Sequence, residues 1–176
     1  MVNSVNSNDF ILKEPTALDK NIVMEYRQEC LDAGLLKGVG FLLGTVDTFE
    51  EWFDIVQKRK NSPDIQTKYL VIRKSDNKLI GILNIRHSLN DPLLLKYNGN
   101  IGSSIRPSER RKGYGSEVLK LGINICKNLN IQSILLICGE NNIASKKIIE
   151  KCGGVLDKKV PLDDGIIQLR YYINLR

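Results

Sequence analysis

Histidine and clustered cysteines are scarce in this sequence. His87 is the only histidine, and none of the four cysteines belongs to a C-x-x-C pair. A zinc site needs several such ligands in one place, so the composition argues against a bound metal. Three of the four cysteines fall on apolar faces of predicted elements, which is typical of buried free thiols.

Long apolar runs are also lacking. No stretch approaches the roughly 18 apolar residues that a membrane-spanning helix needs. The first ten residues, MVNSVNSNDF, have neither a basic start nor an apolar core, so we see no signal peptide. Together with the free cysteines, these absences predict a cytoplasmic protein without a membrane partner.

A dense basic surface is missing as well, although the net charge is +6 and the pI is near 9.1. Lysines and arginines are spread along the chain and mixed with 20 acidic residues. This pattern disfavours nucleic-acid binding as the main function, which stays open as an alternative. With 176 residues, of which 42% are hydrophobic, the chain predicts one domain over residues 1–176.

What the sequence does contain is a basic glycine turn between a strand and a helix, within residues 101–122. Apolar alternation over 101–105 predicts the strand, and Pro107 ends it because proline removes a ladder donor. Apolar residues at helical spacing after the turn predict the helix. This order aims free backbone N–H groups and the positive end of a helix dipole at one point, which suits a phosphate.

Two glycines and three basic residues make up this turn. Gly113 and Gly115 shape it, and Arg110, Arg111 and Lys112 add positive charge. A Cβ at either glycine would block close approach of the backbone to a ligand or hinder a positive φ. A loop that uses glycine only for its own turn is the alternative interpretation of so short a motif.

The turn also carries a family resemblance. Arg110-x-x-Gly113-x-Gly115 resembles the acetyl-CoA pyrophosphate loop of the GNAT superfamily of N-acetyltransferases, whose pattern is Gln/Arg-x-x-Gly-x-Gly/Ala. A second match lies downstream, where residues 142–145 and 148–154 resemble the family's Asn-x-x-Ala/Ser and Leu-Tyr-Glu-Lys-x-Gly-Phe segments. The two halves together are far more specific than either one alone.

The resemblance implies a mixed α/β fold: a single GNAT-like domain with a central mixed β-sheet, helices on both faces and an acetyl-CoA-binding core at about residues 97–160. In that family the central parallel strands splay apart to admit the pantetheine arm. Residues 38–45 and 90–98 are expected to be loops. The expected strands are 10–14, 69–73, 79–88, 100–106, 131–138, 155–160 and 166–173, and the expected helices are 17–33, 48–60, the helix after the turn and the helix that begins at Asn142.

The resemblance further implies acetyl-CoA as the acetyl donor and assigns residues to it. Backbone N–H groups of residues 111–116 would hold the pyrophosphate, and Arg110 would support that loop or contact a phosphate. The backbone of Ser104 and Ile105 would pair with the pantetheine amides like an added strand. Asn142 would face the cofactor arm, and its alternative role is a plain N-cap. The implied cofactor-binding residues are Ser104, Ile105, Arg110, Arg111, Lys112, Gly113, Tyr114, Gly115, Ser116, Asn142 and Ser145.

Catalytic residues are harder to assign from the sequence. An alkylamine has a pKa near 10.4, so about one molecule in 2,500 is neutral at pH 7, and an enzyme must lower that pKa or remove a proton. The family often places a tyrosine near the thiol, but that position is Ile149 here. His87 is a candidate base because its unperturbed pKa lies near neutrality, and Tyr171 is a candidate acid. A lone histidine is more often structural.

The expected acceptor is a small-molecule or peptide amine. Glu25, Glu29 and Asp32 form an acidic stripe on the first predicted helix, which is either a solvated face or an electrostatic guide for a cationic amine. The missing tyrosine leaves a second interpretation open, a non-catalytic acyl-CoA-binding or sensing module on the same fold. A homodimer is compatible with the sequence.

Overall fold

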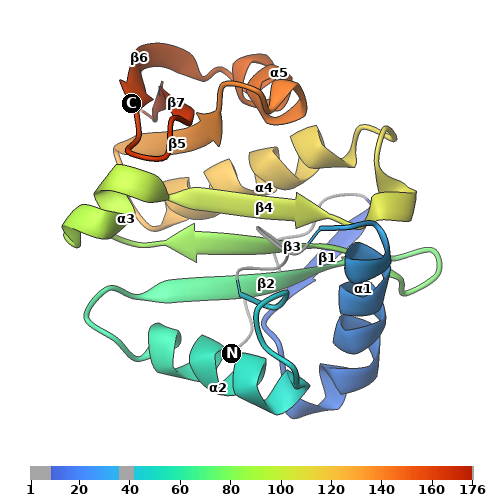
Figure 1. Ribbon diagram of the computed structural model, residues 1–176. Helices are drawn as coiled ribbons and strands as arrows, with labels where there is room; N and C mark the ends of the chain where they lie inside the picture. Colours follow the sequence, from blue (N-terminus) through green and yellow to red (C-terminus); the bar gives the residue numbers. More distant parts are fainter. Residues whose placement is uncertain (1–8, 36–41, 176) are drawn as a thin grey trace.

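A computed structural model of the protein describes residues 9–35 and 42–175 (Figure 1). The predicted loop over residues 38–45 therefore lies partly outside the described residues. The strands are β1 (Phe10–Lys13), β2 (Gln66–Arg73), β3 (Leu79–Arg86), β4 (Ile101–Ile105), β5 (Ser133–Gly139), β6 (Val155–Pro161) and β7 (Ile167–Asn174). The helices are α1 (Lys20–Asp32), α2 (Phe49–Lys60), α3 (Pro92–Tyr97), α4 (Tyr114–Asn128) and α5 (Ile143–Lys151), with short 3-10 turns at Ala17–Asp19 and Pro107–Glu109.

The strands form two antiparallel sheets, ordered β1-β2-β3-β4 and β5-β7-β6. Helices α1 and α2 cover one face of the first sheet, and α4 runs along its other face toward the second sheet (Figure 1). The predicted α/β class with helices on both faces is thus confirmed. The expected single central sheet is divided in two between β4 and β5.

The two sheets meet at Asn100, immediately before β4. Its backbone N–H donates to the Leu135 carbonyl, and its side-chain Oδ1 accepts from the Leu135 N–H, both at 2.8 Å. Its own carbonyl accepts from the Arg86 N–H at 2.8 Å. In the described ranges no further backbone hydrogen bond joins β4 to β5. Asn100 therefore closes one end of a gap that opens along the two strands.

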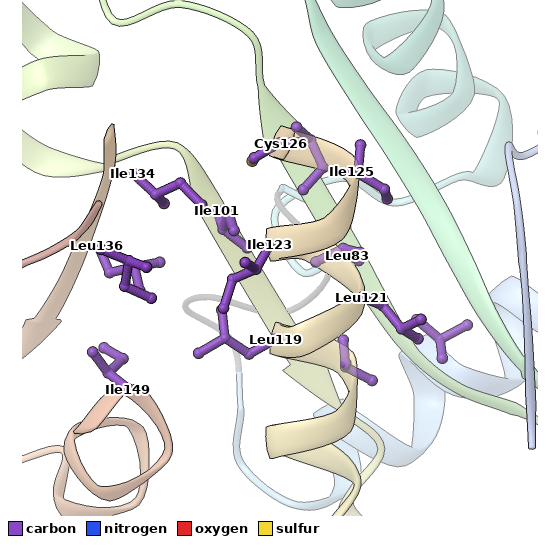
Figure 2. Packing of buried hydrophobic residues seen from close by; sticks show 14 of the residues in the cluster. Leu83, Ile101, Leu119, Leu121, Ile123, Ile125, Cys126, Ile134, Leu136 and Ile149 are labelled. Atoms are coloured by element: carbon purple, nitrogen blue, oxygen red, sulfur yellow. The ribbon is translucent and has the colours of Figure 1, made fainter. Parts of the chain in front are cut away.

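Helix α4 links the two sheets through an apolar core. Figure 2 shows Ile125 and Leu121 near Leu83 of the first sheet, whereas Ile123 and Leu119 point toward Leu136 of the second. All of these side chains are at most 8% exposed. Burying an aliphatic side chain of this size contributes about 1.5–3 kcal/mol, so α4 holds its place mainly through these contacts.

The smaller core lies on the opposite face of the first sheet. Tyr26 of α1 and Trp52 of α2 are fully buried there against Leu70 and Ile82 of the strands. Helix α2 begins with the expected capping box, in which the Thr48 hydroxyl accepts from a backbone N–H one turn later and a glutamate side chain returns the bond. The capping box thus determines where this helix starts, and its apolar residues determine which face is buried.

The prediction of a loop over residues 90–98 was wrong, because α3 occupies most of it. Asp91 is the N-cap, and its carboxylate accepts from the Leu93 N–H at 2.8 Å. Pro92 stands at the first helical position, where its fixed φ suits a helix and its missing N–H costs nothing. The Asp-Pro pair, with an N-cap residue followed by proline, was the sequence signal for this helix.

Within the described residues, no helix is both long enough and apolar enough to cross a membrane. The same part of the chain contains no group of three or more metal-ligating side chains.

Candidate active site

The glycine turn lies between β4 and α4 and exposes a run of backbone donors. Gly113 is the N-cap of α4 with φ +86°, and Arg111 also has a positive φ of 64°. The Ser116 N–H donates to the Gly113 carbonyl at 3.1 Å. In the described part of the chain, the N–H groups of residues 111–115 take no hydrogen-bond partner. Such a cluster at the positive end of a helix suits an anion.

Glu109 anchors this turn to the β2–β3 hairpin, a contact that the sequence analysis missed. Its carboxylate, 4% exposed, accepts from Arg73 at 2.8 Å and from Lys78 and Lys112 at 2.9 Å. Burial alone would raise the pKa of Glu109, but these hydrogen bonds outweigh it and lower the pKa to about 2. Arg73 also donates to the Tyr114 hydroxyl at 3.2 Å, which ties the start of α4 to the same hairpin.

The basic side chains of the turn do different things. Arg110 donates through Nε to the Ile105 carbonyl at 3.1 Å, so it supports the loop, which was one of its two predicted roles. Lys112 directs its ammonium to Glu109. Arg111 is exposed and makes no side-chain hydrogen bond within the described residues, so its guanidinium is the cation that remains available to an anion.

The two glycines of the turn serve different purposes. Gly113 needs its positive φ, and a Cβ there would meet nothing within 4 Å. Gly115 has an ordinary φ, but a Cβ there would lie 2.6 Å from Cδ1 of Ile148 on α5. A positive φ is therefore present at Gly113 and not at Gly115, where the missing Cβ lets α4 pack closely against α5. Close approach of a ligand to either glycine stays a prediction.

We expect Gly115→Val to lower the free energy of unfolding by about 1–3 kcal/mol, because the added side chain overpacks the α4–α5 contact. Adding Ile148→Ala makes room for the valine. The free energy of unfolding lost by the double variant should therefore be about 1 kcal/mol smaller than the sum of the losses in the two single variants. Urea denaturation measures both quantities. Gly139→Val is the matched control, since a Cβ there meets nothing within 4 Å. Strictly additive effects would refute the packing role.

The free edge of β4 faces the gap between the two sheets. Hydrogen bonds from Arg86 N to Asn100 O and from Arg106 N to Ile80 O set the ladder with β3. Since bonded residues alternate in an antiparallel pair, the Ser104 backbone belongs to that ladder. The prediction for the Ser104 backbone is therefore corrected.

The outward-facing backbone groups on that edge belong to Ser103 and Ile105. The Ser104 hydroxyl instead accepts from the Tyr26 hydroxyl at 2.8 Å on the α1 side of the sheet. The Ile105 carbonyl is already engaged by the Arg110 side chain. The Ile105 N–H and both backbone groups of Ser103 are thus the groups left for a ligand in the gap.

The start of α5 follows β5, the strand on the other side of that gap. Asn142 is the N-cap of α5, and its Oδ1 accepts from the Ser145 N–H at 3.1 Å. This confirms the N-cap role, while contact of Asn142 and Ser145 with a cofactor stays a prediction. Ile149, at the position of the family's tyrosine, is 4% exposed and points toward Leu136 in the core (Figure 2).

His87 lies on the face of the first sheet that carries α4. Its Nε2 is 2.9 Å from the Thr67 Oγ1, and it follows Leu83 and Ile85, which pack under α4, at two-residue spacing. Burial lowers the pKa of His87, which favours the neutral imidazole. Its end of β3 adjoins Asn100, about 20 Å of strand away from the glycine turn. The structure thus does not bring His87 together with the turn.

We expect His87→Ala to change kcat less than about threefold, since the imidazole bonds to Thr67 on the α4 face of the sheet and lies away from the turn. Steady-state kinetics and an acetyl-CoA titration measure kcat and affinity separately. Thr67→Val is the matched control because it removes the same hydrogen bond and keeps the imidazole. A kcat loss of tenfold or more, seen only in His87→Ala, would make His87 the base.

Tyr171 lies inside the core on β7 and is fully buried. Its hydroxyl donates to Glu150 Oε1 at 3.1 Å. Burial, followed by this hydrogen bond, raises the pKa of Tyr171 to about 12. The proton is therefore held firmly near neutral pH, and the proposed acid role of Tyr171 stays a prediction.

The acidic stripe of α1 has a partner that the sequence did not reveal. Arg106, which is 3% exposed, donates to Glu25 at 2.7 Å and to Glu29 at 2.5 Å. The Ser108 N–H also donates to Glu29 at 2.7 Å. Burial would raise the pKa of Glu29, but the bonds from Arg106 and Ser108 lower it to about 2. These carboxylates tie α1 to the entrance of the turn, and contact with a substrate stays a prediction for both.

A family model described as an acetyltransferase (GNAT) domain matches residues 11–155. The chain belongs to the GNAT acetyltransferase family. This family uses acetyl-CoA as the acetyl donor. The exposed N–H groups of the turn and the free edge of β4 are features that fit the phosphates and the amide-bearing arm of that donor. No curated protein matches the chain.

Several solved structures share the fold of this GNAT protein. A GNAT-family acetyltransferase from Bacillus anthracis is 20% identical with a TM-score of 0.72, covering 97% of this chain and 98% of that one. The ribosomal L7/L12 alpha-N-protein acetyltransferase RimL, in complex with coenzyme A, is 17% identical with a TM-score of 0.71, covering 96% and 95%. The microcin C7 self immunity acetyltransferase MccE, in complex with acetyl-CoA and AMP, is 13% identical with a TM-score of 0.74, covering 96% and 94%.

Proposed function

We propose that this GNAT protein is an N-acetyltransferase that moves an acetyl group from acetyl-CoA to a primary amine by direct attack in a ternary complex. The observation that carries the proposal is the run of unpartnered N–H groups over residues 111–115 at the start of α4, beside the gap between β4 and β5. Relatives of the same fold bear names of protein and small-molecule acetyltransferases, and their bound coenzymes support the same donor here.

Each part of the site has one task in this proposal. The N–H groups of residues 111–115 and the exposed Arg111 neutralise the pyrophosphate. The Ser103 backbone bonds an amide of the arm, and the Ile105 N–H is placed to stabilise negative charge on the acetyl oxygen. Coenzyme A supplies the acetyl group as an activated thioester.

The reaction balances without a further reactant. The amine nitrogen forms a bond to the acetyl carbon, the carbon–sulfur bond breaks, and the amine proton leaves through water or protonates the departing thiolate. Position 149 is a buried isoleucine, which cannot carry that proton. Rate enhancement then comes mainly from holding the two reactants in line, which is worth about 7–11 kcal/mol in well-oriented systems.

The proposal is tested first by calorimetric titration with acetyl-CoA and then by an amine screen that follows release of the coenzyme thiol. Micromolar acetyl-CoA binding with turnover of at least one amine is the expected result. Binding without turnover on any amine would favour a non-catalytic acyl-CoA-sensing module, an alternative that the core position of Ile149 supports. No binding at millimolar acetyl-CoA would overturn the proposal.

A further inference from the structure

A row of buried polar side chains crosses β2 and β3. Gln66 and Lys68 of β2 stand opposite Arg86 and Asn84 of β3 in the strand register. All four residues are at most 5% exposed, which is unusual for these residue types. Neither the turn nor the β4 edge makes use of them.

The row lies on the face of the sheet that α1 and α2 cover. Leu70 and Ile82, the next opposed pair along the strands, pack in the core under those helices, and side chains two apart share a face. Lys68 and Asn84 are therefore on that face too. Asn84 stands opposite Gly102, the second residue of β4, so the row runs up to a position of β4 where glycine contributes no side chain.

Several polar groups in this row lack partners. Asn84 donates to the Gln66 side chain at 3.4 Å, which leaves Asn84 Oδ1 and Gln66 Nε2 buried without a hydrogen bond. Within the described residues, the Lys68 ammonium makes no hydrogen bond and no ion pair. A buried unsatisfied polar group costs about 1–3 kcal/mol, and a ligand that hydrogen-bonds to several of them would recover that cost.

The charge of the row is positive. Arg86 lies in it, and Arg59 at the end of α2 is close enough to act on Lys68. Burial, followed by these two cations, lowers the pKa of Lys68 to about 8. An anion placed against Lys68 would relieve both the burial cost and the repulsion.

We propose that this row, formed by Gln66, Lys68 and Asn84 beside Gly102, is the acceptor subsite, and that the acceptor is a small amine bearing a carboxylate, of amino-acid size. The inference rests on the proposed acetyltransferase function. Lys68 and Gln66 Nε2 hold the carboxylate, and Asn84 Oδ1 accepts an N–H of the amine. Strands are about 4.8 Å apart, so β2 lies about 10 Å from β4, a span that a lysine side chain and an amino acid fill together.

The same cations would help the chemistry. Positive charge near an amine disfavours its ammonium form, so the subsite lowers the pKa of the bound acceptor and raises the neutral fraction. A sufficient fraction of neutral, reactive amine is then available without a side chain that acts as a general base. The face of the sheet under α1 and α2 would thus lower the pKa of the amine, and His87, on the opposite face, has no part in it.

The test is steady-state acetylation of the standard amino acids, each paired with its carboxamide, at saturating acetyl-CoA. We expect at least one amino acid to exceed its own carboxamide in kcat/KM by about tenfold or more. Lys68→Met should raise the KM for that amino acid by about 30-fold, as loss of one partner of a buried charge pair does, and leave acetyl-CoA affinity unchanged. Gln66→Met is a second variant, expected to reduce the same preference without removing a charge.

Controls separate the subsite from folding and from the donor site. Lys127→Met, at an exposed position on α4, should leave the preference intact. Equal rates for acids and carboxamides, or an equal effect of Lys68→Met on both, would overturn the subsite while acetyl-CoA binding upholds the donor site. If acetyl-CoA binds but nothing turns over, amino acids are titrated into the coenzyme A complex; binding lost in Lys68→Met supports the subsite, and no binding overturns it.

Discussion

Gly113→Val should weaken acetyl-CoA binding by about 100-fold or more. Gly113 has φ +86°, and a left-handed conformation costs a residue with a Cβ about 1–2 kcal/mol, more when it is β-branched. A Cβ would meet nothing within 4 Å, so the turn relaxes rather than the core. The N–H groups beside it then lose their alignment with the pyrophosphate, and two charge-assisted hydrogen bonds of about 1.5–3 kcal/mol each account for the loss.

Two variants control for this result, which calorimetric titration measures. Gly113→Asn tolerates a positive φ and should keep most of the affinity. Gly34→Val imposes the same strain at the end of α1, where φ is +71° and a Cβ also meets nothing within 4 Å, so it should lose stability but keep affinity. Wild-type affinity in Gly113→Val would rule out the turn as the phosphate site.

Glu109→Gln should lower the free energy of unfolding by about 2–4 kcal/mol. The neutral amide leaves Arg73, Lys78 and Lys112 gathered around a site that no longer carries a negative charge. Breaking a fully buried pair costs about 3–5 kcal/mol, and these cations are partly exposed, so the expected loss is somewhat smaller. Chemical denaturation measures it. Glu140→Gln removes a more exposed ion pair with Lys159 and should cost less than about 1 kcal/mol.

The same variant has a signature in acid. The pKa of Glu109 is lowered from 4.5 to about 2 in the folded protein, so its stabilising effect is fully present above pH 4.5 and is lost as the pH falls toward 2. The pKa of Glu29 is lowered in the same way, so a Glu109 variant keeps the part of the pH dependence that Glu29 contributes. The stability difference between wild type and Glu109→Gln should therefore shrink between pH 4.5 and 2. A difference that is constant with pH would contradict the ion-pair role.

Patterns that are local in the chain were predictable. The strand, turn and helix around Gly113 follow from proline, glycine and apolar spacing, and the capping box at Thr48 states the start of α2 directly. The family motif adds the donor because its residues are adjacent in sequence. Only the short α3 was missed among the helices, since its Asp-Pro signal is also that of a turn.

Contacts between distant segments could not be predicted in the same way. Arg106 contacts Glu25 and Glu29, which lie some 80 positions earlier in the chain, and no sequence signal in either segment indicates the other as its partner. The same holds for Glu109 with the hairpin. The choice between Ser103 and Ser104 on the β4 edge depends on ladder register, which a shift of one residue reverses.

The Asn100 junction has a consequence for heat tolerance. Everything in the first sheet is synthesised before residue 106, and everything in the second after residue 132. In the described ranges, hydrogen bonds join β5 to the start of β4 only at Asn100, through its backbone and its side chain. In the proposed complex, acetyl-CoA lies along the gap and would connect the two sheets a second time. By mass action the free energy of unfolding then rises with the concentration of acetyl-CoA, since a ligand at 100 times its Kd stabilises the folded state by about 2.7 kcal/mol. When acetyl-CoA is scarce, the protein should therefore unfold at a lower temperature.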